Sequence, residues 1–197
     1  MKENKFVVCI TGASGVIYGI RLMEELSKVG KVYVVVSKNG YIVMEKEHKI
    51  KKTDFLKKYF NNPNIEIVSD RNIASKLASG SFLTNFKGVI IAPCSMSTLG
   101  AIANGVNYNL IHRISEVALK ERVKLILLVR EMPYSLIHIE NMRKITLSGG
   151  IIAPASPSFY HYPTTVEDMV NFVVGKILDL IGIENNLYRR WNNRDEN

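Results

Sequence analysis

The sequence has little cysteine, no long apolar run and no internal repeat, and each shortage excludes a class of protein. The 197 residues include two cysteines, Cys9 and Cys94, too few for a disulfide framework or a cysteine-rich metal site. The apolar run at residues 6–10 is too short for a signal peptide, and far shorter than the roughly 20 residues that cross a bilayer. We therefore expect a cytoplasmic protein with reduced thiols and no membrane span.

The charge balance is basic: 26 lysines and arginines stand against 18 acidic residues, a formal net charge of +8. Such a charge suits a polyanion, an anionic small molecule or a well-solvated surface. Much of the lysine lies at residues 46–58, beside Glu45 and among Glu47 and Asp54, which favours a solvated helical face. No aromatic stripe or nucleic-acid motif accompanies it, so we expect no nucleic-acid partner. The four histidines are scattered without metal-ligand spacing, so we expect no metal site.

Strands and helices alternate along the whole chain. Apolar, β-branched runs are typical of parallel strands buried on both faces. We expect strands at 6–10, 32–36, 65–68 (at an edge), 88–92, 124–129 and 151–154. We expect helices at 16 to about 30, through the lysine-rich segment to about 59, and at 73–77, 97–103, 111–120, 135–147 and from Thr164 or Thr165 onward, with a loop at 80–84. This order predicts one α/β domain with a mostly parallel central sheet, residues 1–183, followed by a polar tail, residues 184–197.

Two turns rich in glycine and hydroxyl groups follow the first and fourth expected strands. Residues 11–15 read Thr-Gly-Ala-Ser-Gly, and residues 95–98 read Ser-Met-Ser-Thr. Each places backbone N–H groups and short hydroxyls at a helix N-terminus, where a phosphate binds. Helix capping alone would use the same residue types. Together the two turns predict a nucleotide-type cofactor at the carboxyl ends of parallel strands.

The first turn departs from the dinucleotide fingerprint. Gly12, Gly15 and Gly19 give G-x-x-G-x-x-x-G, and the second strand ends at Ser37 without an acidic residue for an adenosine ribose. These departures favour a mononucleotide such as FMN over NAD.

Charged and aromatic residues mark further candidate positions. Arg130 and Glu131 follow strand 124–129 at the ligand edge of the sheet, where an arginine suits an anion and a glutamate can move protons. A local salt bridge between them is the alternative. The loop 159–163 reads Phe-Tyr-His-Tyr-Pro, and its rings either seal the core or line an apolar pocket. We interpret Cys94 as a small residue at a strand end rather than a nucleophile.

In this order, these motifs resemble those of the UbiX-type flavin prenyltransferases, also described as Pad-type aromatic acid decarboxylase accessory flavoproteins. The resemblance covers nearly the whole chain and implies a Rossmann-like or flavodoxin-like three-layer sandwich. It further implies a homo-oligomer, typically a dodecamer, with active sites at subunit junctions and no metal. It rests on residues 11–15, 19–22, 92–99, 119–122, 129–133, 140–142, 154–155, 159–160 and the tryptophan at 191.

The resemblance implies transfer of a dimethylallyl group from dimethylallyl monophosphate to N5 and C6 of reduced FMN. The product, prenylated FMN, would pass to a UbiD-type decarboxylase. Such chemistry needs clustered cations around the leaving phosphate and electron-rich rings around a cation-like transition state.

The resemblance also assigns roles to residues of this chain. FMN would be held by Gly12, Ala13, Ser14, Ser37, Ser95, Met96, Ser97, Thr98 and Arg130. The prenyl phosphate would be held by Arg113, Lys120, Tyr160 and Lys176, with Glu47 reaching it from a neighbouring subunit. Catalysis would fall to Glu131 as a proton relay with Ser14 close by, and to the rings of Tyr160 and Trp191. The tail would thus serve the active site or oligomer contacts. Two departures are Lys176, where members often have arginine, and Phe82, where some have tryptophan.

Three alternatives come from other functional classes. An FMN-dependent decarboxylase of the cysteine decarboxylase group shares the first turn, but should carry an active-site histidine and an asparagine-bearing motif where this chain has residues 93–96. A passive FMN carrier would not need the pair Arg130 and Glu131. A nucleic-acid binder is disfavoured because no motif supports it.

Overall fold

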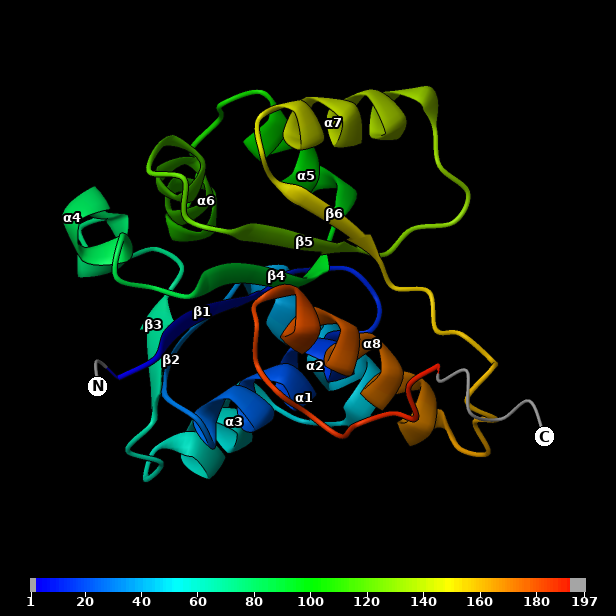
Figure 1. Cartoon of the computed structure of the whole chain (residues 1–197). Coiled ribbons are helices and arrows are strands. Elements are labelled where there is room, and N and C mark those ends of the chain that lie inside the picture. The colour runs from blue at the N-terminus through cyan, green and yellow to red at the C-terminus, as the bar shows by residue number, and fades with distance from the viewer. Residues whose placement is uncertain (1–2, 192–197) are drawn as a thin grey trace.

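The apolar runs form one six-stranded sheet in the computed structural model, which describes residues 3–191 (Figure 1). The order is β3-β2-β1-β4-β5-β6, and every neighbouring pair is parallel. The strands are β1 (Lys5–Ile10), β2 (Lys31–Val36), β3 (Ile65–Ser69), β4 (Gly88–Cys94), β5 (Leu125–Val129) and β6 (Ile151–Pro154). The predicted α/β class and parallel sheet are confirmed, and β3 lies at an edge as expected.

Helices cover both faces of the sheet (Figure 1). One face carries α1 (Val16–Ser27), α2 (Lys38–His48), α3 (Lys52–Tyr59) and α8 (Val166–Leu180). The other carries α4 (Gly80–Leu83), α5 (Met96–Ala103), α6 (Leu110–Lys120) and α7 (Leu136–Leu147), together with the 3₁₀ helix Lys76–Ala78. This is the predicted three-layer sandwich. No helix within residues 3–191 is long and apolar enough to cross a membrane.

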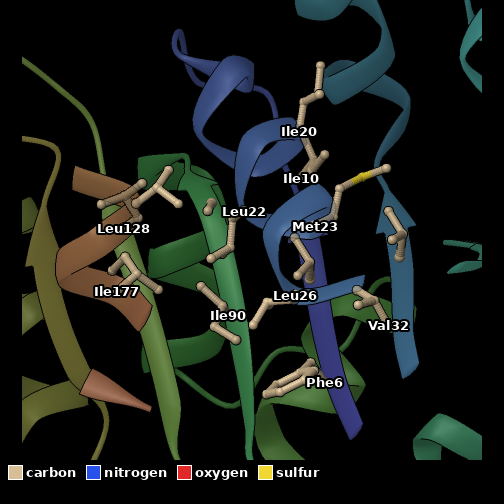
Figure 2. Packing of buried hydrophobic residues seen from close by; sticks show 14 of the residues in the cluster. Phe6, Ile10, Ile20, Leu22, Met23, Leu26, Val32, Ile90, Leu128 and Ile177 are labelled. Carbon is tan, nitrogen blue, oxygen red and sulfur yellow. The ribbon is translucent and has the colours of Figure 1, made fainter. Parts of the chain in front are cut away.

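Side chains alternate between two hydrophobic cores because successive strand residues point to opposite faces. Figure 2 shows one core, where Leu22 and Leu26 of α1 pack over Phe6 and Ile90 of the sheet. Cys9 and Cys94 belong to the other core and are fully buried. Burial raises the pKa of both thiols, so they stay protonated and unreactive.

One local prediction is refined by the structure and two are wrong. The lysine-rich segment is two helices, because Lys49 adopts a left-handed conformation (φ 58°) that ends α2. Residues 80–83, expected as a loop, form α4, and the helix expected at 73–77 is the 3₁₀ turn at 76–78. Burial of Leu83 and ring contacts between Phe82 and Tyr33 outweigh the local preference of Gly-Ser for a loop.

Thr165 begins α8, as one of the two predicted caps. Its hydroxyl accepts a hydrogen bond from the Asp168 N–H at 3.1 Å, and the Asp168 carboxylate accepts one from the Thr165 N–H at 2.9 Å. This reciprocal pair is a capping box. Of the predicted tail, residues 184–191 pack along α8, whereas residues 192–197 lie outside the described residues, as do residues 1–2 of the predicted domain.

The strand order reverses between β1 and β4. The chain after β1 continues into α1 on one face, and the chain after β4 continues into α5 on the other. Such a switch point leaves a crevice at the carboxyl ends of the strands. Buried Thr11 ties its two sides together: its hydroxyl donates to the Pro93 carbonyl at 2.8 Å and accepts from the Ser95 N–H at 2.8 Å.

Replacing Thr11 should therefore loosen the crevice. Thr11→Val keeps the side chain's shape but leaves the Ser95 N–H without its acceptor, and we expect the free energy of unfolding to fall by about 2 kcal/mol. Urea denaturation measures the loss, and Thr11→Ser, which keeps the hydroxyl, is the control. A loss in Thr11→Ser as large as in Thr11→Val would show that methyl packing matters instead.

Candidate functional site

A cavity of about 400 Å³ opens at the switch point between β1 and β4. Its walls come from the turns after β1, β2, β3 and β4 and from the start of α6. Five of the predicted FMN residues line it: Gly12, Ser37, Ser95, Ser97 and Thr98. The two turns singled out in the sequence thus meet in one place.

Two helix N-termini border this cavity. Ser37 caps α2, where its hydroxyl accepts from the Gly40 N–H at 3.0 Å. Ser95 caps α5, where its hydroxyl accepts from the Thr98 N–H at 3.3 Å and lies 3.1 Å from the Ser97 hydroxyl. N–H groups and hydroxyls gathered at helix N-termini favour a phosphate.

The sequence suggested a phosphate at the N-terminus of α1, but in the structure the carboxylate of Glu47 lies there. The Gly15 N–H donates to the Glu47 carboxylate, at 3.0 Å to Oε2 and 3.3 Å to Oε1. A carboxylate there satisfies the helix dipole, so the helix N-termini left open to an anion at the cavity are those of α2 and α5. The assignment of Glu47 to a neighbouring subunit's substrate stays a prediction.

Gly12 and Arg130 test whether the cavity fits a flavin nucleotide. A Cβ on Gly12 would lie 2.6 Å from the Cβ of Asn39, so only glycine allows the first turn to pass this close to α2. The buried Nε of Arg130, at the end of β5, has no hydrogen-bond partner among residues 3–191. That donor suits an acceptor on a ligand. The residues present therefore fit FMN.

Four predicted FMN residues, Ala13, Ser14, Met96 and Arg130, are not among the residues that line the cavity. Ala13 is buried within the first turn, Ser14 is exposed on it, and Met96 packs against the core. Glu131 is half-buried, and its carboxylate accepts from the Met132 N–H at 3.0 Å. In the described part of the chain, no ion pair joins Glu131 to Arg130, so the salt-bridge alternative is wrong.

Sequence reasoning missed seven cavity residues: Lys38, Asn39, Asp70, Ala101, Tyr108, Asn109 and His112. Asp70 follows β3 at the ligand edge, so the rule that found Arg130 would also have found it. Asn109 caps α6 by accepting from the His112 N–H at 3.0 Å, and the His112 ring accepts from the Tyr108 N–H at 3.2 Å. Burial lowers the pKa of His112, which favours the neutral ring.

The residues predicted to hold the prenyl phosphate form two groups. Arg113 and Lys120 lie on α6, paired with Glu116 and Glu121. Tyr160 and Lys176 lie with α8, on the opposite face of the sheet. A single chain therefore does not bring all four together.

The predicted aromatic pair is close. The rings of Tyr160 and Trp191 meet edge to face, with centroids 5.4 Å apart at 89°. Tyr160 also contacts Phe172 of α8 at 5.8 Å, and the His161 ring stacks on Phe172 at 5.1 Å. The loop at 159–163 thus packs on the core and also presents a ring outward. Within residues 3–191, no group of three or more histidines, cysteines or carboxylates is arranged to hold a metal ion.

Comparison with known proteins places this site in a family. The model of the Flavoprotein family matches residues 1–178. The flavin prenyltransferase UbiX of Aquifex aeolicus is 54% identical over 95% of this chain and 98% of its own length. The structure of AnUbiX in complex with FMN and dimethylallyl pyrophosphate has a TM-score of 0.90 at 33% identity, covering 97% of this chain and 98% of that one.

A dodecameric FMN-dependent UbiX-like decarboxylase from Escherichia coli O157:H7 has a TM-score of 0.87 at 36% identity, covering 95% of this chain and 99% of that one. The FMN-dependent cysteine decarboxylase TvaF, in contrast, is 19% identical with a TM-score of 0.61, covering 77% of this chain and 90% of its own, which is a likeness of fold alone. Curated relatives that are 40–54% identical over at least 95% of this chain are flavin prenyltransferases UbiX, and the chain belongs to the UbiX family of flavin prenyltransferases.

Proposed function

We propose that this protein joins the dimethylallyl group of dimethylallyl monophosphate to N5 and C6 of reduced FMN, making prenylated FMN. The observation that carries the proposal is the cavity at the switch point, where the N-termini of α2 and α5 and their hydroxyls converge. The names of the relatives, and the complex of AnUbiX with FMN and a prenyl diphosphate, support the same activity.

The FMN phosphate is assigned to the ends of α2 and α5. Ser95, Ser97 and Thr98 offer hydroxyls there, Met96 adds a backbone N–H, and Ser37 lies across the cavity. The rest of the flavin is assigned to the first turn, at Gly12, Ala13 and Ser14, and to the unpaired Nε of Arg130.

Reduced FMN, when bound, supplies the nucleophilic nitrogen and carbon that accept the prenyl group. The half-buried carboxylate of Glu131 is placed to take up and return a proton at the carboxyl end of β5. The hydroxyl of Ser14, which is exposed on the turn after β1, is assigned a place close to the Glu131 carboxylate. Tyr160 and Trp191 present ring faces to the developing allylic cation.

The leaving phosphate is assigned to Arg113, Lys120, Lys176 and the Tyr160 hydroxyl, with Glu47 reaching it from a neighbouring subunit. Because these residues occupy opposite layers of one chain, a complete site needs more than one subunit. The dodecameric relative supports such an assembly, and we infer a homo-oligomer of that size with sites at its subunit junctions. The product is assigned to a UbiD-type decarboxylase in the cytoplasm, where the two reduced cysteines fit.

The activity is tested with purified protein, reduced FMN and dimethylallyl monophosphate in the absence of oxygen. Mass spectrometry of the released flavin should show the added prenyl group. Glu131→Gln should bind FMN normally but turn over about 100-fold more slowly, because it cannot exchange the proton. Glu140→Gln, an exposed change on α7, is the control. Unmodified flavin from folded wild-type protein would refute the activity, and normal turnover by Glu131→Gln would refute the relay.

Gly12 tests the position of FMN. The methyl group of Gly12→Ala would push Asn39, and with it the N-terminus of α2, away from the cavity. We expect the dissociation constant for FMN, measured by quenching of flavin fluorescence, to rise about tenfold. The double variant Gly12→Ala with Asn39→Gly removes the colliding atom and should regain most of the affinity. Full affinity in the single variant would place FMN elsewhere.

Lys176 tests the donor site. Lys176→Met removes a cation and should raise the KM for dimethylallyl monophosphate about tenfold, while the FMN dissociation constant stays unchanged. Lys176→Arg keeps the charge and should stay close to wild type. Lys57→Met, on the exposed side of α3, controls for net charge. An unchanged KM in Lys176→Met would remove this lysine from the donor site.

A further inference from the structure

The segment after α8 turns back and runs along that helix (Figure 1). Asn185, Tyr188 and Arg190 all contact the same residue of α8, Asp179. The last residue described, Trp191, follows directly and meets the Tyr160 ring. The position of this tryptophan is therefore tied to the contacts of Asp179.

Asp179 uses both carboxylate oxygens in these contacts. Arg190 binds it through two nitrogens, at 2.7 Å to Oδ1 and 3.0 Å to Oδ2. The Tyr188 hydroxyl donates to Oδ2 at 2.6 Å, and the Asn185 amide donates to Oδ1 at 2.9 Å. Paired hydrogen bonds between a guanidinium and a carboxylate fix orientation as well as distance.

The contacts of Asp179 with Asn185, Tyr188 and Arg190 form a clamp, and the ionisation states of Asp179 and Tyr188 favour it. Burial alone would raise the pKa of Asp179, but the hydrogen bonds from Arg190, Tyr188 and Asn185 hold it below its ordinary value. Burial and the neighbouring Asp179 carboxylate raise the pKa of Tyr188 to about 12. At neutral pH the carboxylate is therefore ionised, and the phenol keeps the proton that it donates.

Because Gly175 has no side chain, Tyr188 and Asn185 can pack directly against α8, and this contact does not depend on charge. A Cβ there would lie 2.6 Å and 2.8 Å from two ring atoms of Tyr188, and 2.9 Å from the Asn185 side chain. Asn185 also donates to the Gly175 carbonyl at 3.3 Å. Tyr188 in turn packs edge to face on Phe172, with centroids 4.9 Å apart, and Phe172 contacts Tyr160.

We propose that Asp179 is a positioning residue for prenyl transfer: by holding residues 185–190 against α8 at Gly175, it places Trp191 against Tyr160. This rests on the proposed function, in which these two rings face the allylic cation.

The clamp also leaves Lys176 available. The Lys176 ammonium lies 4.0 Å from Asp179 Oδ2, farther than either nitrogen of Arg190. Since Arg190 occupies both oxygens of the carboxylate, Lys176 can direct its charge to a phosphate. Asp179 thus orders the ring pair without capturing the cation assigned to the donor site on this layer.

Two full-length variants break the clamp in different ways. Asp179→Ala removes the acceptor, and Gly175→Ala fills the space beside Tyr188 and displaces its ring without a change of charge. Glu167→Ala, an exposed carboxylate in the first turn of α8, is the matched control. Trp191 is the chain's one tryptophan, so time-resolved fluorescence anisotropy of the flavin-free protein reports its motion directly.

We expect both clamp variants, but not the control, to gain a fast nanosecond depolarisation of Trp191. Their kcat should fall about tenfold, as expected for loss of a cation–π contact with the transition state. The dissociation constant for FMN should not change, which separates loss of position from loss of folding. Unchanged anisotropy decays in both Asp179→Ala and Gly175→Ala would overturn the clamp.

Trp191→Leu separates the clamp from the proposed function. If Asp179 acts through Trp191, the double variant with Asp179→Ala should lose no more kcat than Trp191→Leu alone. Additive losses would overturn that inference. An unaffected kcat in Trp191→Leu would instead contradict the aromatic wall of the proposed function, and the anisotropy of the clamp variants would still decide whether Asp179 places the ring.

Discussion

One buried hydroxyl joins the two halves of this sheet where the site needs them joined. At the switch point the chain leaves β1 and β4 toward opposite layers, and within the described chain a single backbone bond, from the Thr11 N–H to the Pro93 carbonyl at 3.2 Å, joins the two turns there. The Thr11 hydroxyl adds two more, since it binds the backbone of Pro93 and Ser95 at once. These bonds hold the N-terminus of α5 beside the turn after β1, and the bond from the Ser37 N–H to the Ile10 carbonyl at 3.0 Å brings the N-terminus of α2 to the same turn, so both helix ends border one cavity.

Local signals predicted the parts of the fold that depend on local physics. The β-branched runs identified all six strands, and the Thr165 cap identified the start of α8. The same signals failed at residues 80–83, because burial of Leu83 depends on a partner far away in sequence. They also did not show that Glu47 reaches Gly15, since that contact depends on how α2 packs beside α1.

The candidate site also has a part that local sequence signals predict and a part that depends on long-range contacts. Turns that follow strands could be assigned from sequence, because every parallel strand delivers its carboxyl end to one edge, and five predicted residues do line the cavity. The layer on which a helix lies is set by the whole topology. Only the resemblance grouped Arg113 and Lys120 with Tyr160 and Lys176, which the sheet separates within one chain. Only the resemblance to a family of oligomers pointed to subunit junctions.

The exposure of the aromatic pair argues for the same junctions on physical grounds. Trp191 is 73% exposed and Tyr160 37% exposed in the single chain. Ring faces stabilise a cation most strongly where water is excluded, so a wall this open is incomplete until another surface covers it. The clamp at Asp179 can fix the position of the Trp191 ring but cannot exclude water from it. A neighbouring subunit that brings Arg113 and Lys120 across would supply the missing cations and exclude the water in the same step.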